Sequence, residues 1–342
     1  MNDKYILCLP RGCGFNDVLC QIYLAFQFAK KTNRTLMLDT RLSGLADSLS
    51  DYFELTIIDT SIILGVKTED LNNLNQLSCF PHKYEGKLQW IYHRFLAIDA
   101  KKIYQWPYFN TIRNIINVIT YALNCSELNT ILQKTNFILN HITARENNFQ
   151  IELDKLENHP ADIIVHHLSG GGEDSIRILE ILKLRKSIIN VINGTTNFLG
   201  SDYDAIHIRN TDYESDFVSF VEQIKQKLQN RRVLLCTDNY NVIKVVRAIL
   251  NQSEIITINK YYPKSKKKNI PIHFQWHLSK EKIRSNNISM LAELLAMANA
   301  KRIFYPDLID NIHKTSVSGF SLLAKNLNPR PDRVNQLMRI NS

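Results

Sequence analysis

The sequence lacks any long hydrophobic run, and this absence argues against an integral membrane protein. Nowhere do about eighteen consecutive residues stay apolar, the length that a membrane-spanning helix needs. The opening residues, MNDKYILCLPRGCG, meet a proline and a glycine before an apolar stretch of signal-peptide length can form. We therefore expect a cytoplasmic protein.

The sequence also lacks the common fingerprints of metal and nucleotide sites. Its six cysteines form no CxxC pair, so we expect them to be small core side chains. The loop with Gly12 and Gly14 has neither a full GxGxxG pattern nor the lysine of a P-loop. Asp202 and Asp204 form a DxD motif, but turn chemistry explains them equally well. We expect no metal and no bound cofactor.

Acidic residues are in deficit, which leaves a formal net charge of +9. Part of the excess lies in one basic tract formed by Lys264, Lys266, Lys267 and Lys268. Such a tract is typical of a solvated loop, or of a peripheral contact with an anionic membrane surface or a polyanionic acceptor. Nucleic acid is disfavoured because the tract has no interleaved aromatic residues and no reading module accompanies it.

The order of the apolar segments predicts an α/β protein built from two Rossmann-like domains, residues 1–195 and 196–342. The chain begins with a strand at 5–9, a glycine-rich turn, an amphipathic helix and a strand at 35–39. Later elements are expected as strands at 162–166, 205–209, 232–237, 255–258 and 302–305, and as helices at 174–184, 216–229, 240–250, 288–299 and 318–327. The turn-rich segment 193–204 is the expected linker, and 50–160 favours helices without defining a topology.

Polar residues at the ends of strands are the first candidates for function, because open α/β sheets bind ligands there. Arg209 ends a strand of the second half, where its planar fork of donors can grip a diphosphate. A structural ion pair with Asp212 or Asp238 is the alternative. His207 lies on the same face as Arg209, either at the site or as a hydrogen-bonded core histidine.

A second candidate is the helix start formed by Ser318, Gly319, Phe320 and Ser321. Free backbone N–H groups and two hydroxyls would face the same cleft there, which makes an anion site. Plain capping of the helix by serine is an equally good explanation of this motif alone.

Together these motifs resemble the GDP-fucose-dependent fucosyltransferase superfamily, and most closely the rhizobial nodulation α1,6-fucosyltransferase group. Residues 14–39, GFNDVLCQIYLAFQFAKKTNRTLMLD, are similar to the family's opening loop, helix and turn. AIHIRNTDY at 205–213 is similar to its His-x-Arg motif. The third match runs from MLAELLAMANAKRIFYP at 290–306 to SGFSLLAKNL at 318–327.

The resemblance implies a GT-B-type fold and an inverting, metal-independent glycosyltransferase that moves a sugar, fucose by analogy, from a GDP-sugar to a glycan hydroxyl. Bacterial surface polysaccharide synthesis is the expected setting. By the same resemblance, Arg209 holds the β-phosphate. The other implied donor-binding residues are His207 and Asp238 near the nucleoside, Ser318 and Ser321 near the phosphates, and Gly319, Phe320, Gly14 and Asn16 around them.

Two departures from the family pattern leave the sugar and the linkage open. Asn210 stands where many α1,2 and α1,6 members have a second arginine. Leu291 stands near the position of a family aspartate, with Glu293 as the close substitute. The alternatives are a transferase of the same fold with another activated sugar, and a non-catalytic nucleotide- or carbohydrate-binding protein.

Transfer through an oxocarbenium-like state requires a base for the acceptor hydroxyl as well as stabilisation of the leaving diphosphate. Asp17, in the N-terminal loop, is the first candidate for this base, followed by Asp212 and Glu173. The alternative for Asp17 is a capping role, since carboxylates favour helix starts.

Overall fold

The structure is a computed structural model of the chain. It describes residues 4–10, 13–56, 59, 61–88, 153, 156–167, 170–211, 213, 215–258, 278–308 and 317–339. Asp212 and the basic tract at 264–268 lie outside these residues, as does most of the segment for which no topology was predicted. Within the described part of the chain, no helix is long and apolar enough to cross a membrane.

The first half of the chain forms a parallel five-stranded sheet in the order β4-β2-β1-β6-β5. Its strands are β1 (Tyr5–Cys8), β2 (Thr35–Leu38), β4 (Ile62–Ile63), β5 (Cys79–Phe80) and β6 (Ile163–His166). Helix α1 (Phe15–Thr32) connects β1 to β2 and buries the apolar face that includes Val18, Ile22, Ala25 and Ala29. The predicted opening strand–helix–strand unit is confirmed.

The second half forms a separate parallel sheet in the order β10-β9-β8-β11. Its strands are β8 (Asp204–Ile208), β9 (Arg232–Thr237), β10 (Glu254–Ile256) and β11 (Ile303–Phe304), and its connecting helices include α8 (Phe217–Leu228) and α9 (Tyr240–Ile249). These elements match the predicted alternation to within one or two residues at most ends. The predicted α/β class with parallel sheets is confirmed.

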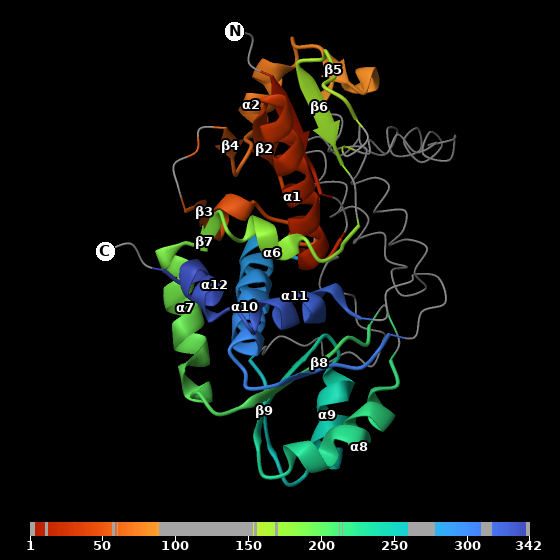
Figure 1. The fold of residues 1–342 in the computed structure, drawn as a ribbon, viewed down its shortest axis with the longest axis vertical. Coiled ribbons are helices and arrows are strands. Elements are labelled where there is room, and N and C mark those ends of the chain that lie inside the picture. Colours follow the sequence, from red (N-terminus) through yellow and green to blue (C-terminus); the bar gives the residue numbers. More distant parts are fainter. Residues whose placement is uncertain are drawn as a thin grey trace.

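Three helices near the C-terminus, drawn in blue, lie between the two sheets in Figure 1. They are α10 (Lys280–Ala298), α11 (Gly319–Leu327) and α12 (Pro331–Leu337). Helix α10 packs against α7 (Lys186–Thr196), α11 against α1, and α12 against the short strand β7 (Leu182–Leu184). The last part of the chain thus packs on the first half, and the division at 195/196 stays a prediction.

A buried polar network joins α10 to the loop after β2. The amide of Asn287 donates to the carbonyl oxygen of Leu45 at 2.8 Å and to the hydroxyl of Tyr52 at 2.9 Å. The same hydroxyl donates to the Asp47 carboxylate at 2.7 Å. Because unsatisfied buried polar groups are costly, this network fixes the loop at 44–52 relative to α10.

Among the described residues, the remaining elements are small. They are β3 (Phe53–Leu55), α2 (Thr68–Leu74), α6 (Ser175–Ile178) and the 3-10 helices Leu49–Asp51, His82–Tyr84 and Asn197–Leu199. Strand β3 pairs with β7 in an antiparallel ribbon, with Phe53 opposite Leu184.

Three sequence predictions are wrong in detail. The helix expected at 174–184 ends at Ile178, because residues 182–184 pair with β3 as a strand instead. The expected linker at 193–204 begins inside α7, whose buried face of Ile188, Ile189 and Ile192 keeps the helix intact through Gly194. The helix expected at 288–299 starts earlier, at Lys280, where the Ser279 hydroxyl caps it by accepting from the backbone N–H of Lys282.

Candidate functional site

A cleft opens where β8 and β9 end and where α1 and α11 begin. It is lined by Gly14, Phe15, Gly44, Leu45, His207, Arg209, Thr237, Asp238, Asn286, Met290, Glu293, Ser318 and Phe320. The structure therefore gathers six of the predicted site residues from distant parts of the chain. They are Gly14, His207, Arg209, Asp238, Ser318 and Phe320.

His207 is a buried histidine held in one orientation. Its Nδ1 shares a hydrogen bond of 2.6 Å with the hydroxyl of Ser321, and its ring centroid lies 5.2 Å from that of Phe320. Burial, and then the nearby charge of Arg209, lower the pKa of His207 to about 3. The imidazole is therefore neutral at physiological pH, so it offers hydrogen bonding to the cleft without adding charge.

Arg209 directly follows β8, and its guanidinium lies over the ring of Tyr213 at 4.6 Å from the ring centroid. Its charge also acts on two neighbours, because it disfavours the protonated, charged form of His207 and favours the ionised form of Asp17. The planar fork of donors on a guanidinium is suited to recognition of an anion in the cleft.

Asp238 anchors the loop that follows Arg209. One carboxylate oxygen accepts from the backbone N–H of Asn210 at 2.8 Å, and the other accepts from the Thr211 hydroxyl at 2.5 Å. Asn239 supports the same loop by donating to the carbonyl oxygen of Asn210 at 2.9 Å. Asp238 thus lines the cleft and also determines the course of the chain beside Arg209.

Two helix starts meet at the cleft. Gly14 precedes α1 in an extended conformation, and no side chain caps that helix. Ser318 precedes α11; its side chain is nearly fully buried, and its hydroxyl has no hydrogen-bond partner among the described residues. Free N–H groups at helix starts carry a partial positive charge, so two of them beside one arginine form a site suited to an anion.

Asn16 holds these two helix starts together. Its amide donates to the carbonyl oxygen of Gly172 at 3.1 Å, while its own oxygen accepts from the Ser175 hydroxyl at 2.6 Å. Gly319 packs so closely on Asn16 that an added Cβ would lie 3.0 Å from the amide nitrogen. These contacts support the cleft from one side, and donor binding by Asn16 stays a prediction.

Asp17 is not among the residues that line the cleft, but its carboxylate interacts with Arg209, which does line it. Burial raises the pKa of its carboxyl, while a hydrogen bond from Asn16 and the charge of Arg209 act in the opposite direction. A Cβ added to Gly171 would overlap the Asp17 carboxylate, so the glycine loop at 170–172 passes directly against it. Among the candidate bases, Asp17 has a described interaction with Arg209, Asp212 lies outside the described residues, and Glu173 is exposed.

The acidic residue that α10 contributes to the cleft is Glu293. Leu291, near the position of the family aspartate, is buried in the hydrophobic core instead. Asn286 and Gly44 also line the cleft, although they were not among the predicted site residues. They come from the first half of a helix and from a loop, and no local pattern marks them.

The DxD residues have structural partners. Asp204 is fully buried between two arginines, at 3.0 Å from Arg231 Nε and 2.8 Å from Arg302 Nη2. Asp202 lies 2.6 Å from Arg231 Nη2 and 2.8 Å from Lys301 Nζ. In the part of the chain that the structure describes, no three His, Cys, Asp or Glu side chains are grouped as metal ligands would be.

Solved structures share this architecture, although no protein-family model and no curated protein matches the sequence. The fucosyltransferase NodZ from Bradyrhizobium superposes with a TM-score of 0.51 at 18% identity, over 96% of this chain and 95% of NodZ. NodZ α1,6-fucosyltransferase co-crystallised with GDP gives a TM-score of 0.52 at 18% identity, over 96% and 94% of the two chains. The predicted resemblance to fucosyltransferases is thereby confirmed at the level of the fold.

Proposed function

We propose that this chain is a glycosyltransferase that moves fucose from GDP-fucose to a hydroxyl group of a glycan. Its fold is that of NodZ, which has been crystallised with GDP and soaked with GDP-fucose. Under this proposal the two sheets belong to two Rossmann-like domains in a GT-B arrangement. The donor binds at the carboxyl ends of the second sheet, where ligands of open α/β sheets are found.

The observation that carries the proposal is the position of Arg209 beside two helix starts. Arg209, Gly14 and Ser318 line one cleft. Arg209 contributes a guanidinium, Gly14 and Ser318 stand at helix starts with backbone N–H donors, and Ser318 adds a hydroxyl. A diphosphate can accept a bidentate pair of hydrogen bonds from the guanidinium, the backbone N–H groups at the start of α11, and the buried Ser318 hydroxyl. Ser318 would thereby gain the partner that the described residues do not supply.

The nucleoside end of the donor is assigned to His207 and its neighbours. A neutral imidazole next to Phe320 offers a hydrogen bond and an apolar surface, which suits a base or ribose better than a phosphate. The hydrogen bond between Nδ1 and the Ser321 hydroxyl fixes the orientation of the ring, and it thereby also fixes the direction of Nε2. Asp238 supports this end through the loop after Arg209.

The reaction follows from these positions. The acceptor hydroxyl oxygen forms a bond to C1 of the sugar, and the bond between C1 and the diphosphate oxygen breaks with its electron pair on GDP. Arg209 and the start of α11 stabilise the charge that develops on that oxygen. Asp17 takes the hydroxyl proton, and attack from the face opposite the leaving group inverts the configuration at C1.

No metal ion is part of this mechanism, because the guanidinium and helix starts supply the positive charge and the DxD carboxylates are held by arginines. We expect turnover to persist in excess EDTA. If chelation abolished turnover and Mg²⁺ or Mn²⁺ restored it, Asp202 and Asp204 would instead be assigned a metal-binding role.

The acceptor is proposed to be a cytoplasmic precursor of a bacterial surface polysaccharide. The basic tract at 264–268 is proposed to contact an anionic membrane surface.

Calorimetric titration with GDP, UDP, CMP and ADP tests the proposal. We expect GDP to bind and the other three to bind much more weakly. Preference for UDP, CMP or ADP would indicate the same fold with another activated sugar. Binding of none of the four would favour the non-catalytic alternative. Ser318→Ala should weaken GDP binding, while Ser285→Ala, outside the cleft lining, is the matched control and should leave it unchanged.

A further inference from the structure

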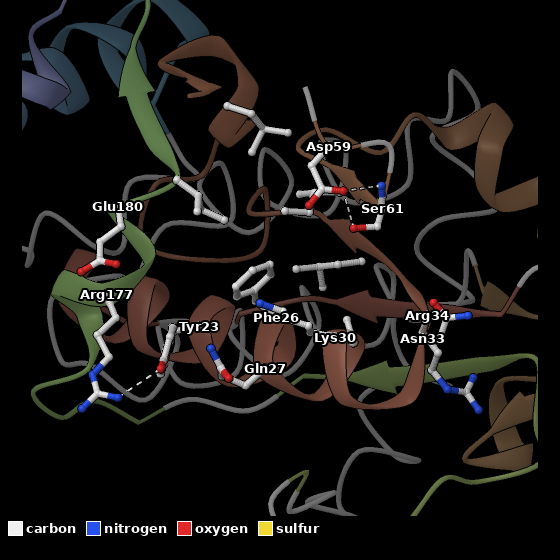
Figure 2. A pocket seen from close by; sticks show the side chains of 15 residues that line it. Tyr23, Phe26, Gln27, Lys30, Asn33, Arg34, Asp59, Ser61, Arg177 and Glu180 are labelled. Carbon is white, nitrogen blue, oxygen red and sulfur yellow. Dashed lines mark hydrogen bonds between the residues drawn. The ribbon is translucent and has the colours of Figure 1, made fainter. Parts of the chain in front are cut away.

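A second and larger cavity lies along the C-terminal half of α1, away from the cleft. Its volume is about 770 Å³, within the range of small-molecule sites. Figure 2 shows this groove between α1, the β2–β4 edge of the first sheet, and the segment at α6. It is lined by Tyr23, Phe26, Gln27, Ala29, Lys30, Asn33, Arg34, Leu36, Leu55, Asp59, Ser61, Ile62, Arg177, Glu180 and Ile181.

One face of α1 forms the long wall of this α1 groove. Tyr23, Gln27 and Lys30 follow the three- and four-residue spacing that places side chains in a row on a helix. Opposite this row, Asp59 and Ser61 stand on the far rim in Figure 2. Leu36 and Ile62 add apolar surface to the floor, beside the half-buried ring of Phe26. The groove thus combines a small apolar floor with polar rims.

Several charged side chains around the α1 groove are held by protein partners. Arg177 donates to the Tyr23 hydroxyl at 3.2 Å and forms an ion pair with Asp174 at 3.1 Å. Glu180 pairs with Arg333 at 3.0 Å. Asp59 accepts hydrogen bonds from both the backbone N–H and the hydroxyl of Ser61.

Arg34 also forms its hydrogen bonds with protein groups outside the groove lining. Its guanidinium turns away from the groove in Figure 2 and donates to the carbonyl oxygens of His159, Ala161 and Asp162. The lining carries positive charge on Lys30, Arg34 and Arg177 and negative charge on Asp59 and Glu180, so both signs are present and neither is concentrated in the groove. It therefore favours an uncharged ligand rich in hydroxyl groups over a phosphate or a carboxylate.

We propose that the α1 groove binds a neutral oligosaccharide, with a sugar ring against Phe26 and Tyr23 and its hydroxyls bonded to Gln27 and Asn33. Aromatic faces contact the apolar C–H face of a sugar, while planar amides bond its hydroxyls. An acyl chain fits less well, because nine of the fifteen lining side chains are polar or charged.

The occupant is the part of the acceptor glycan remote from the reacting sugar, an assignment that rests on the proposed transferase function. Helix α1 connects the two sites, since Phe15 at its start lines the cleft, while Tyr23, Gln27, Lys30 and the C-cap residue Asn33 line the groove. At 1.5 Å per residue, the groove spans roughly 12–27 Å from Phe15 along the helix axis. Only an acceptor of several sugar units can reach both sites, so the groove selects chain length.

The test is direct binding of neutral hexasaccharides of glucose, galactose, mannose and N-acetylglucosamine, observed by saturation-transfer NMR and titration. At least one should bind. Tyr23→Ala and Gln27→Ala should each weaken that binding by about tenfold or more. Gln27 is exposed, so its replacement leaves the fold intact. Lys31→Ala, on the same helix but outside the groove lining, is the matched control and should bind normally.

Three results would overturn the groove assignment: no hexasaccharide binds, both groove variants bind as the unmodified protein does, or laurate displaces the sugar from the groove. GDP titration of the same samples separates this inference from the proposed function. Oligosaccharide binding that depends on Tyr23 and Gln27, without any GDP binding, would retain the groove and reject the transferase. GDP binding without oligosaccharide binding would reject the groove assignment and retain the proposed transferase function.

Discussion

The Nδ1 atom of His207 lies 2.6 Å from the hydroxyl of Ser321 and joins the first strand of the second sheet to α11. Both side chains are buried. The bond places the start of α11 beside the end of β8, so that Ser318 and Arg209 line the same cleft. The geometry of the cleft therefore depends on a histidine that stays neutral.

Buried neutral histidines make the stability of the protein sensitive to acid. The pKa values of His207 and His166 are lowered from 6.5 to about 3, mainly by burial. Between these pH values the unfolded chain binds more protons, so the free energy of unfolding should fall as the pH falls. Each histidine adds a slope of about 1.4 kcal/mol per pH unit.

Urea denaturation between pH 8 and pH 5 measures this slope. The raised pKa of Asp17 acts in the opposite direction, so a variant is needed to isolate one histidine. His166 is hydrogen-bonded to Gln21. His166→Gln should reduce the slope below about pH 6.5 by about 1.4 kcal/mol per pH unit, the contribution of one proton. An unchanged slope in this variant would show that His166 is not buried in its neutral form.

Asp17→Asn should abolish transfer and stabilise the fold. The folded-state pKa of this carboxyl is raised by burial, so its ionised form costs stability at every pH above the unfolded value. Removing the charge should raise the melting temperature at pH 7 to 8, and the gain should shrink as the pH falls through the folded-state pKa toward the unfolded-state value. Thermal melting and GDP release from GDP-fucose measure the two effects. A variant with normal turnover would reject Asp17 as the base.

Gly171→Ala and Gly172→Ala form a matched pair. An added methyl group at Gly171 would overlap the Asp17 carboxylate, whereas nothing lies within 4 Å of a Cβ at Gly172. We expect turnover to drop at least tenfold in Gly171→Ala, because the base and Arg209 are displaced, and to stay near normal in Gly172→Ala. Equal turnover in the two variants would mean that the loop does not position Asp17.

The regular elements near the cleft could be predicted from the sequence because their signals are local. Alternating apolar residues define β8 and β9, and the 3.6-residue spacing defines α1. The positions of Arg209 and Ser318 followed from a general rule about strand ends and helix starts. These predictions needed no knowledge of which segments pack together.

Features that depend on tertiary pairing could not be predicted in this way. Residues 182–184 continue a helical pattern but form a strand, because β3 supplies a partner from far away in the chain. Asn16 looked like part of a phosphate loop, yet its hydrogen bonds go to Gly172 and Ser175. The α1 groove is likewise formed by segments without a shared motif, so only the folded structure reveals it.

The most direct test of the account is the rate of GDP release from GDP-fucose by Arg209→Ala, with the glycan acceptor or water as the second substrate. Arg209→Ala should lose about a hundredfold or more in kcat/KM, with a larger effect on turnover than on donor binding, because its bond strengthens as the leaving group gains charge. Arg209→Lys should restore little, since a point charge lacks the planar fork. A correctly folded Arg209→Ala protein with near-normal kcat/KM would contradict the assignment of the donor site.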